Sequence, residues 1–220
     1  MSSTRAHTNN QPQGTSTLQS IANLLSYVLH PVFMPLLITF VMYKLAPASF
    51  AGYTQKQIGL WFASIGFTMV FFPLFTMLLL KGLGFLKSFK MESTKDRIVP
   101  LMATMIFYFW ASHVFNNIPS PNLIKILLMG CFWGTIVLFM LNIFVKVSLH
   151  TSAAGGAVAM LLIMMPGNFT NMLLPLGMAL VVSALIGKVR LLCKAHTPAE
   201  VWLGFITGII VQLAAYAYMR

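Results

Sequence analysis

Acidic residues are nearly absent from this sequence: only Glu92, Asp96 and Glu200 occur among 220 residues. A two-metal site or a site for a hard cation such as Mg²⁺ needs several carboxylate ligands. We therefore expect no metal and no other cofactor. The only cysteines are Cys131 and Cys193, too few for a disulfide framework or a cysteine-based zinc site.

Charge of either sign is also scarce. Only 8% of the residues are charged and 58% are hydrophobic, whereas a soluble domain has about a quarter of its residues charged. The chain therefore needs lipid as its solvent. The net charge is +11 and lies in short segments between apolar runs. This favours anionic lipid headgroups or phosphate-bearing substrates as partners, and not nucleic acid.

Long apolar runs predict an all-α, polytopic transmembrane helical bundle, because about 20 apolar residues cross a bilayer core as helix. A charge-free stretch over 147–187 is broken by Pro166-Gly167-Asn168 and predicts a hairpin whose first arm is short. Residues 1–20 are expected to be a disordered polar tail and 21–220 one domain. Seven spans are expected, or six if the first, kinked segment does not cross: 21–43, 58–80, 98–118, 126–145, 151–165, 169–187 and 201–219.

Three polar clusters remain between these spans, at 90–97, 146–152 and 190–200. Two spans separate each cluster from the next. An even number of crossings returns the chain to the same side, so all three clusters are expected at one membrane face.

The clusters offer groups suited to a phosphate. Lys90, Arg97 and Arg190 are candidate anion binders, because guanidinium and ammonium groups pair with phosphate oxygens. Ser148 adds a hydroxyl donor.

The same clusters hold His150 and His196, which titrate near neutral pH, with Glu200 as an acceptor behind His196. A histidine pair with a carboxylate suits covalent transfer, in which one imidazole attacks and the other protonates the leaving group.

The spacing of these residues resembles the type 2 phosphatidic acid phosphatase (PAP2)/haloperoxidase superfamily. That pattern is Lys, six residues, Arg-Pro; then Pro-Ser-Gly-His; then Ser-Arg, five residues, His, three residues, Asp. The resemblance covers about residues 90–208. The matching residues are, in order, Lys90 and Arg97, Ser148 and His150, and Arg190, His196 and Glu200.

The resemblance implies His196 as a nucleophile that forms a phosphohistidine, His150 as the general acid, and Glu200 in place of the Asp that orients the nucleophile. It implies a metal-free reaction. The residues expected to bind the substrate phosphate are Lys90, Arg97, Ser148, Arg190 and the amide of Leu149.

The sequence departs from the family pattern where Val147 and Leu149 replace Pro and Gly, where Ile98 replaces the Pro after Arg97, and where Val189 precedes Arg190. Leu149 keeps an N–H but lacks the freedom of glycine. A divergent enzyme therefore stays an alternative.

Structural interpretations stand beside these roles. Thr197-Pro198-Ala199-Glu200 is typical of a helix start, with Thr197 as N-cap and Glu200 as its reciprocal partner. His30 and His113 fall on apolar spans and are interpreted as structural.

The sequence thus predicts a membrane phosphatase acting on a lipid or isoprenoid phosphate, with membrane lipids around it. The alternatives are a phosphotransferase, a small anion or lipid-phosphate transporter, and an inactive assembly protein. The positive-inside tendency would place the clusters in the cytoplasm. The family resemblance favours the outer face of a bacterial inner (plasma) membrane.

Overall fold

The computed structural model describes residues 30–85, 93–166 and 169–220, with side chains of 169–171 excepted. All regular structure in these ranges is helical, which confirms the all-α prediction. The elements are η1 (Pro31–Phe33), α2 (Met34–Leu45), η2 (Pro47–Phe50), α3 (Gln55–Ile65), η3 (Gly66–Phe71), α4 (Phe72–Gly82), η4 (Lys95–Arg97), α5 (Ile98–Asn117), α6 (Asn122–Phe144), α7 (Leu149–Met164), α8 (Phe169–Leu192) and α9 (Pro198–Met219).

Five helical segments are long and apolar enough to cross a membrane, which makes the chain a multi-pass membrane protein. Large apolar side chains face outwards on these helices, as lipid contact requires; Leu174 is 74% exposed and Phe144 is 81% exposed. Two further apolar helices are shorter, at Pro31–Leu45 and Leu149–Met164. The five long segments are Gln55–Gly82, Lys95–Asn117, Asn122–Phe144, Met172–Leu192 and Pro198–Met219.

Beyond the first span, the observed helices begin or end up to five residues from the expected bounds. The helix expected at 58–80 begins at Gln55, where Thr54 and Gln57 form a capping box, and it includes the π-helical η3. The helix expected to end at 187 continues to Leu192, so Arg190 lies in a last turn, where a cation complements the helix dipole. In the expected span 21–43, helix is described only from Pro31; residues 1–29 lie outside the described part.

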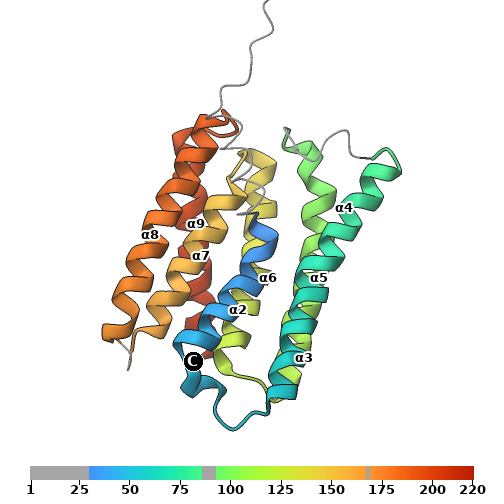
Figure 1. Cartoon of the computed structure of the whole chain (residues 1–220). Helices are drawn as coiled ribbons and strands as arrows, with labels where there is room; N and C mark the ends of the chain where they lie inside the picture. The colour runs from blue at the N-terminus through green and yellow to red at the C-terminus, as the bar shows by residue number, and fades with distance from the viewer. Residues whose placement is uncertain (1–29, 86–92, 167–168) are drawn as a thin grey trace, which may run out of the picture.

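α7 is surrounded by α2, α6, α8 and α9 (Figure 1). Its most extensive contact is with α9, because small residues bring the two backbones together. A Cβ added at Gly204 would overlap the backbone oxygen of Ser148, and one at Gly208 would overlap that of Ser152. This close packing fixes the start of α7 against the start of α9.

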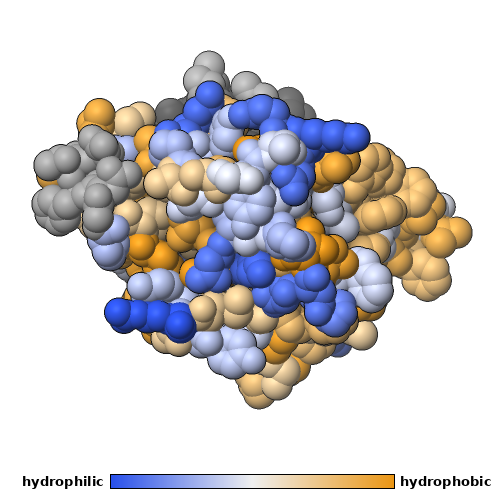
Figure 2. All heavy atoms as spheres, turned by 90° about the horizontal axis from the view of Figure 1, so that it is seen from below, coloured by the Kyte–Doolittle hydropathy of each residue, from blue (hydrophilic) through white to orange (hydrophobic). Residues whose placement is uncertain are grey.

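The two ends of the bundle differ from its sides. The starts of α5, α7 and α9 and the end of α8 lie at the upper end in Figure 1. Figure 2 views the lower end, where hydrophilic residues extend over the centre and reach the edge in places, and hydrophobic residues lie beside them. A polar end surrounded by apolar sides is what a membrane-crossing bundle presents to water.

Candidate active site

His196 lies in the short connection between α8 and α9, and the residue is buried, with 8% of its surface exposed. The chain turns into this connection at Lys194, whose φ of 51° is left-handed. The Nδ1 atom of His196 lies 3.0 Å from the backbone oxygen of Lys146 and 3.0 Å from Oε2 of Glu200. Contacts from α9 and from the segment before α7 therefore hold the ring.

These contacts decide which ring nitrogen is available. Both partners of Nδ1 are acceptors, so Nδ1 carries the proton and Nε2 keeps its lone pair. Burial, followed by the positive charge of Arg97, lowers the pKa of His196 from 6.5 to about 4, although the hydrogen bond to Glu200 acts in the opposite direction. The imidazole is therefore neutral near pH 7, the form that a nucleophile needs.

Glu200 both caps the start of α9 and contacts His196, the two interpretations that the sequence allows. Its Oε2 accepts the backbone N–H of Thr197 at 3.1 Å, and the Thr197 side chain accepts the N–H of Glu200 at 3.4 Å. This capping box, with Pro198 at the first helical position, confirms the predicted helix start. The same carboxylate contacts His196, so the helix start also holds the imidazole in place.

The start of α7 lies against this unit. The N–H of Ser148 donates to the Glu200 carbonyl at 3.3 Å, and the Thr151 hydroxyl donates to the Val201 carbonyl at 2.8 Å. Leu149 and His150 begin the helix, where the first N–H groups have no intrahelical acceptor and favour an anion.

Ser148 has a structural contact in this structure. It is fully buried, caps α7 by accepting the N–H of Thr151, and is not among the described residues that line the cavity below. Its role in phosphate binding stays a prediction.

Arg97 contacts this unit from a segment 50 residues earlier in the chain. It lies in η4, is 5% exposed, and donates from Nη1 to the Val147 carbonyl at 2.9 Å. A second link runs nearby, from the Asn142 side chain to the Thr94 carbonyl at 2.8 Å. The first and second polar clusters therefore meet, as the crossing parity predicted.

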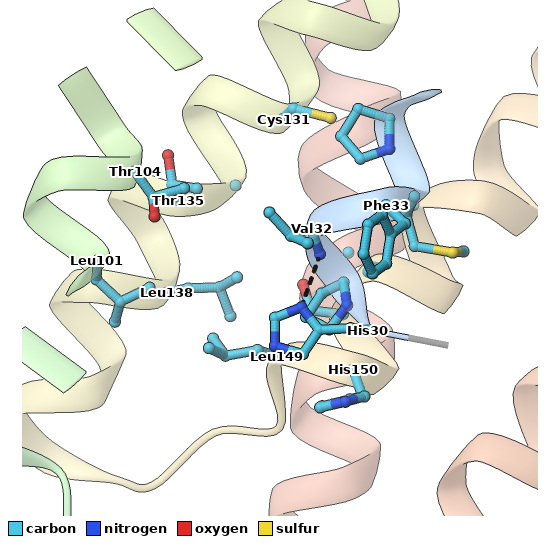
Figure 3. A pocket seen from close by; sticks show the side chains of 18 of the residues that line it. His30, Val32, Phe33, Leu101, Thr104, Cys131, Thr135, Leu138, Leu149 and His150 are labelled. Carbon is cyan, nitrogen blue, oxygen red and sulfur yellow. Dashed lines mark hydrogen bonds between the residues drawn. The ribbon is translucent and has the colours of Figure 1, made fainter. Parts of the chain in front are cut away.

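A cavity of about 930 Å³ connects these groups. Cations and imidazoles line it together with many apolar side chains of α2, α4, α5, α6 and α7, such as Ile38, Met77, Leu101, Leu127 and Ala157, and with uncharged polar ones such as Thr104 and Gln212. Figure 3 shows His30, Leu149 and His150 near one another, with Val32, Leu101 and Leu138 in the adjoining part, where Thr104 and Thr135 also lie. Its polar lining residues include His30, Arg97, Lys146, His150, Arg190, Lys194 and His196.

The cavity thus brings together five of the predicted site residues: Arg97, Leu149, His150, Arg190 and His196. Glu200 lies behind His196, and Lys90 lies outside the described residues.

Three lysine and histidine residues of the lining were missed. Lys146 and Lys194 fall inside the predicted clusters but had no motif position. His30 was interpreted as part of an apolar span, whereas the structure places it before η1, on the cavity wall. The following Pro31 was the available signal. Proline favours the first position of a helix, so the residue before it is expected to be the N-cap and not part of a continuous span. His113, by contrast, is exposed on α5.

Metal ligands do not cluster in the part of the chain that the structure describes: no group of three or more His, Cys, Asp or Glu side chains could hold an ion there. The cavity instead offers cationic groups, which can neutralise a phosphate directly.

One family model matches the chain. Residues 141–220 match the PAP2 superfamily. The match confirms the resemblance predicted from the sequence and supports a protein of phosphatase type. It covers the segments of His150 and His196 and leaves Arg97 outside. In comparisons with curated proteins and with solved structures, nothing matches.

Proposed function

We propose that the protein is a membrane phosphatase that hydrolyses a lipid-linked phosphate monoester or diphosphate through a phosphohistidine, without a metal. The observation that carries the proposal is the state of His196. Its Nδ1 is committed to two acceptors, so the lone pair on Nε2 is available for attack on phosphorus.

The reaction has two steps. His196 Nε2 forms a bond to phosphorus while the P–O bond to the leaving group breaks, and His150 gives its proton to the departing oxygen. Water then attacks the phosphohistidine, His150 takes a proton from that water, and inorganic phosphate leaves with His196 restored. Glu200 stabilises the positive charge that the His196 ring carries as the phosphohistidine forms.

The charged lining suits the transferred phosphoryl group. Arg97 reaches the cavity from η4 and Arg190 from α8, and guanidinium groups neutralise charge that develops on phosphate oxygens. The N–H groups at the start of α7 add dipoles of the same sign. Lys90 stays a predicted phosphate ligand.

The apolar lining suits the rest of an amphiphile. A substrate that places its headgroup among the cations can leave its hydrocarbon chain among the side chains of α2, α5 and α6. This favours a lipid or isoprenoid phosphate over a soluble one. We place the protein in a bacterial inner membrane, with the site at the outer face, following the family resemblance.

The test is phosphate release by purified protein in EDTA, with phosphatidic acid and an isoprenoid diphosphate as substrates. Rapid quenching of a reaction with substrate labelled in its phosphoryl group should trap an acid-labile phosphoenzyme. His196→Ala should abolish both signals, because it removes the bond-forming atom, whereas His113→Ala should change neither.

Other outcomes identify the alternatives. Release that stops in EDTA and returns with Mg²⁺ contradicts the metal-free reaction. Transfer of label to an added alcohol in preference to water indicates a phosphotransferase. Transport of phosphate without hydrolysis, or no chemistry at all, indicates a transporter or an inactive member.

A further inference from the structure

His30 lies on the wall of the cavity, and within the described residues one of its two ring nitrogens has a hydrogen bond. Its Nδ1 accepts the backbone N–H of Val32 at 3.3 Å, which caps η1. The following Pro31 lacks an N–H, so the first donor of this helix is that of Val32. The capping contact accounts for one nitrogen and leaves the other to be explained.

The capping contact also fixes the ring's state. Because Nδ1 accepts a hydrogen bond, it holds a lone pair, and the proton of the neutral ring is on Nε2. His30 is therefore an N–H donor on the side of the ring away from the helix it caps. Inside a cavity suited to phosphate, such an N–H group can donate a hydrogen bond to a phosphate oxygen.

The neighbours of His30 indicate which part of a substrate it meets. Its ring centroid is 5.5 Å from that of His150, at an angle of 80°. His150 is the group proposed to protonate the leaving oxygen. The next residues, Val32 and Phe33, line the cavity as apolar side chains (Figure 3). His30 thus lies where the polar lining gives way to the apolar lining.

We propose that His30 is a specificity-determining residue whose Nε2–H donates to an oxygen on the leaving-group side of the scissile P–O bond. The proposal rests on the proposed function. A diphosphate presents a charged phosphate at this place, with several acceptor oxygens. An alkyl monoester presents only its bridging oxygen. His30 therefore favours a diphosphate amphiphile over a monoester.

The competing explanation is that His30 only caps η1. Two substitutions separate the two roles. In His30→Asn the side-chain oxygen lies near the position of Nδ1 and keeps the cap, but the Nε2–H donor is lost. In His30→Gln the amide nitrogen reaches the position of Nε2 and keeps the donor, while the cap is weakened.

Binding provides the readout that does not depend on turnover. We would measure the affinity of a farnesyl diphosphate analogue with a methylene bridge and of farnesyl phosphonate, in the full-length protein in detergent. A hydrogen bond to a charged oxygen corresponds to about 10- to 100-fold in affinity. His30→Asn should lose this factor for the diphosphate analogue and change phosphonate binding only slightly, and His30→Gln should recover most of it.

The matched control is His113→Asn, the same substitution at an exposed histidine of α5. Equal weakening of both ligands in His30→Asn, or wild-type affinity for both, would overturn the proposal. So would a larger loss in His30→Gln than in His30→Asn, since that order indicates the cap. If the wild type releases no phosphate but shows this binding pattern, hydrolysis is the part that fails and the assignment of His30 stands.

Discussion

The two walls of the cavity are built differently. One wall consists of α7, α8 and α9, where glycines on α9 let its backbone contact α7, and where hydrogen bonds link His196 and Glu200 to residues 146–148. The other wall consists of η1 with α2, of α4, and of η4 with α5, and it contributes His30, Arg97 and many of the apolar lining residues.

The contacts between the walls are sparse by comparison. α2 touches α7 over a limited area, and Arg97 reaches across with its hydrogen bond to Val147. α6 packs against both α5 and α9 and so joins the walls. We infer that the wall of α7, α8 and α9, called the tight wall below, fixes the reacting groups. The other wall, called the adaptable wall, adapts to the substrate. The tight wall is also the part that matches the PAP2 superfamily.

After the complete loss expected for His196→Ala, the largest effect is expected for His150→Ala in the tight wall. Loss of proton donation should lower hydrolysis of an alkyl phosphate by about 10²–10⁴-fold. The loss should be much smaller for nitrophenyl phosphate, whose leaving group is a weak base and needs little protonation. Rapid quenching should still trap a phosphoenzyme.

This result would distinguish the roles of two residues in the same wall, His150 and His196. If His150→Ala abolished the phosphoenzyme while His196→Ala kept it, the roles of the two histidines would be reversed.

The next effect concerns the packing of the tight wall. In Gly208→Ala the new Cβ would overlap the backbone oxygen of Ser152, and neither backbone has a flexible end that could move aside. Overpacking of this kind costs about 1–3 kcal/mol. Thermal unfolding in detergent should show the loss, and hydrolysis should fall with it because the starts of α7 and α9 separate.

The control is Gly177→Ala on α8, where nothing lies within 4 Å of an added Cβ. That protein should unfold at or slightly above the wild-type temperature, because alanine favours helix over glycine. Equal losses in the two variants would mean that close packing of α7 on α9 is not what holds this wall.

The same contrast explains what the sequence could predict. Hydropathy alone predicts the helices, since lipid demands long apolar runs. The capping box at Thr197 and Glu200 is a local signal and was predicted residue by residue. The motif spacing singled out Arg97 and Arg190, and both line the cavity.

Other features depend on how distant segments meet. Ser148 was predicted to bind phosphate, but the depth to which α7 packs on α9 buries it completely. His30 has no polar neighbours in sequence, and its place beside His150 follows from where α2 begins within the bundle (Figure 1). Such packing depths cannot be obtained from periodicity.

A smaller effect is expected for Arg97→Lys in the adaptable wall. Lysine keeps the charge, but a single ammonium cannot hold the Val147 carbonyl and two phosphate oxygens in a planar fork. Loss of one charge-assisted hydrogen bond should lower kcat/KM by about 10-fold and weaken inhibition by vanadate.

Lys95→Ala provides the control for Arg97→Lys, because Lys95 is an exposed cation in the same η4. It should behave as wild type. If Lys95→Ala weakened vanadate inhibition as much as Arg97→Lys, the effect would be a general surface potential and not a specific contact across the cavity.

The smallest effect is a shift in the acid limit of phosphoenzyme formation. His196 attacks only when Nε2 is unprotonated, and burial together with Arg97 lowers its pKa from 6.5 to about 4. The rate of the first step should therefore stay level from pH 7 to about pH 5 and fall as the pH drops through about 4, whereas an unperturbed imidazole would already lose reactivity below pH 6.5.

The two walls act on this limit in opposite directions. Arg97→Gln removes a cation that lowers the pKa, so the limit should move to higher pH. Glu200→Gln removes an anion and a hydrogen bond that raise it, so the limit should move to lower pH, while the Lys146 carbonyl still keeps the proton on Nδ1. Single-turnover labelling between pH 3.5 and 7.5 would measure both shifts, with folding checked at each pH by tryptophan fluorescence. An unchanged limit in Arg97→Gln would show that Arg97 does not act across the cavity on the nucleophile, and an unchanged limit in both variants would show that burial alone sets it.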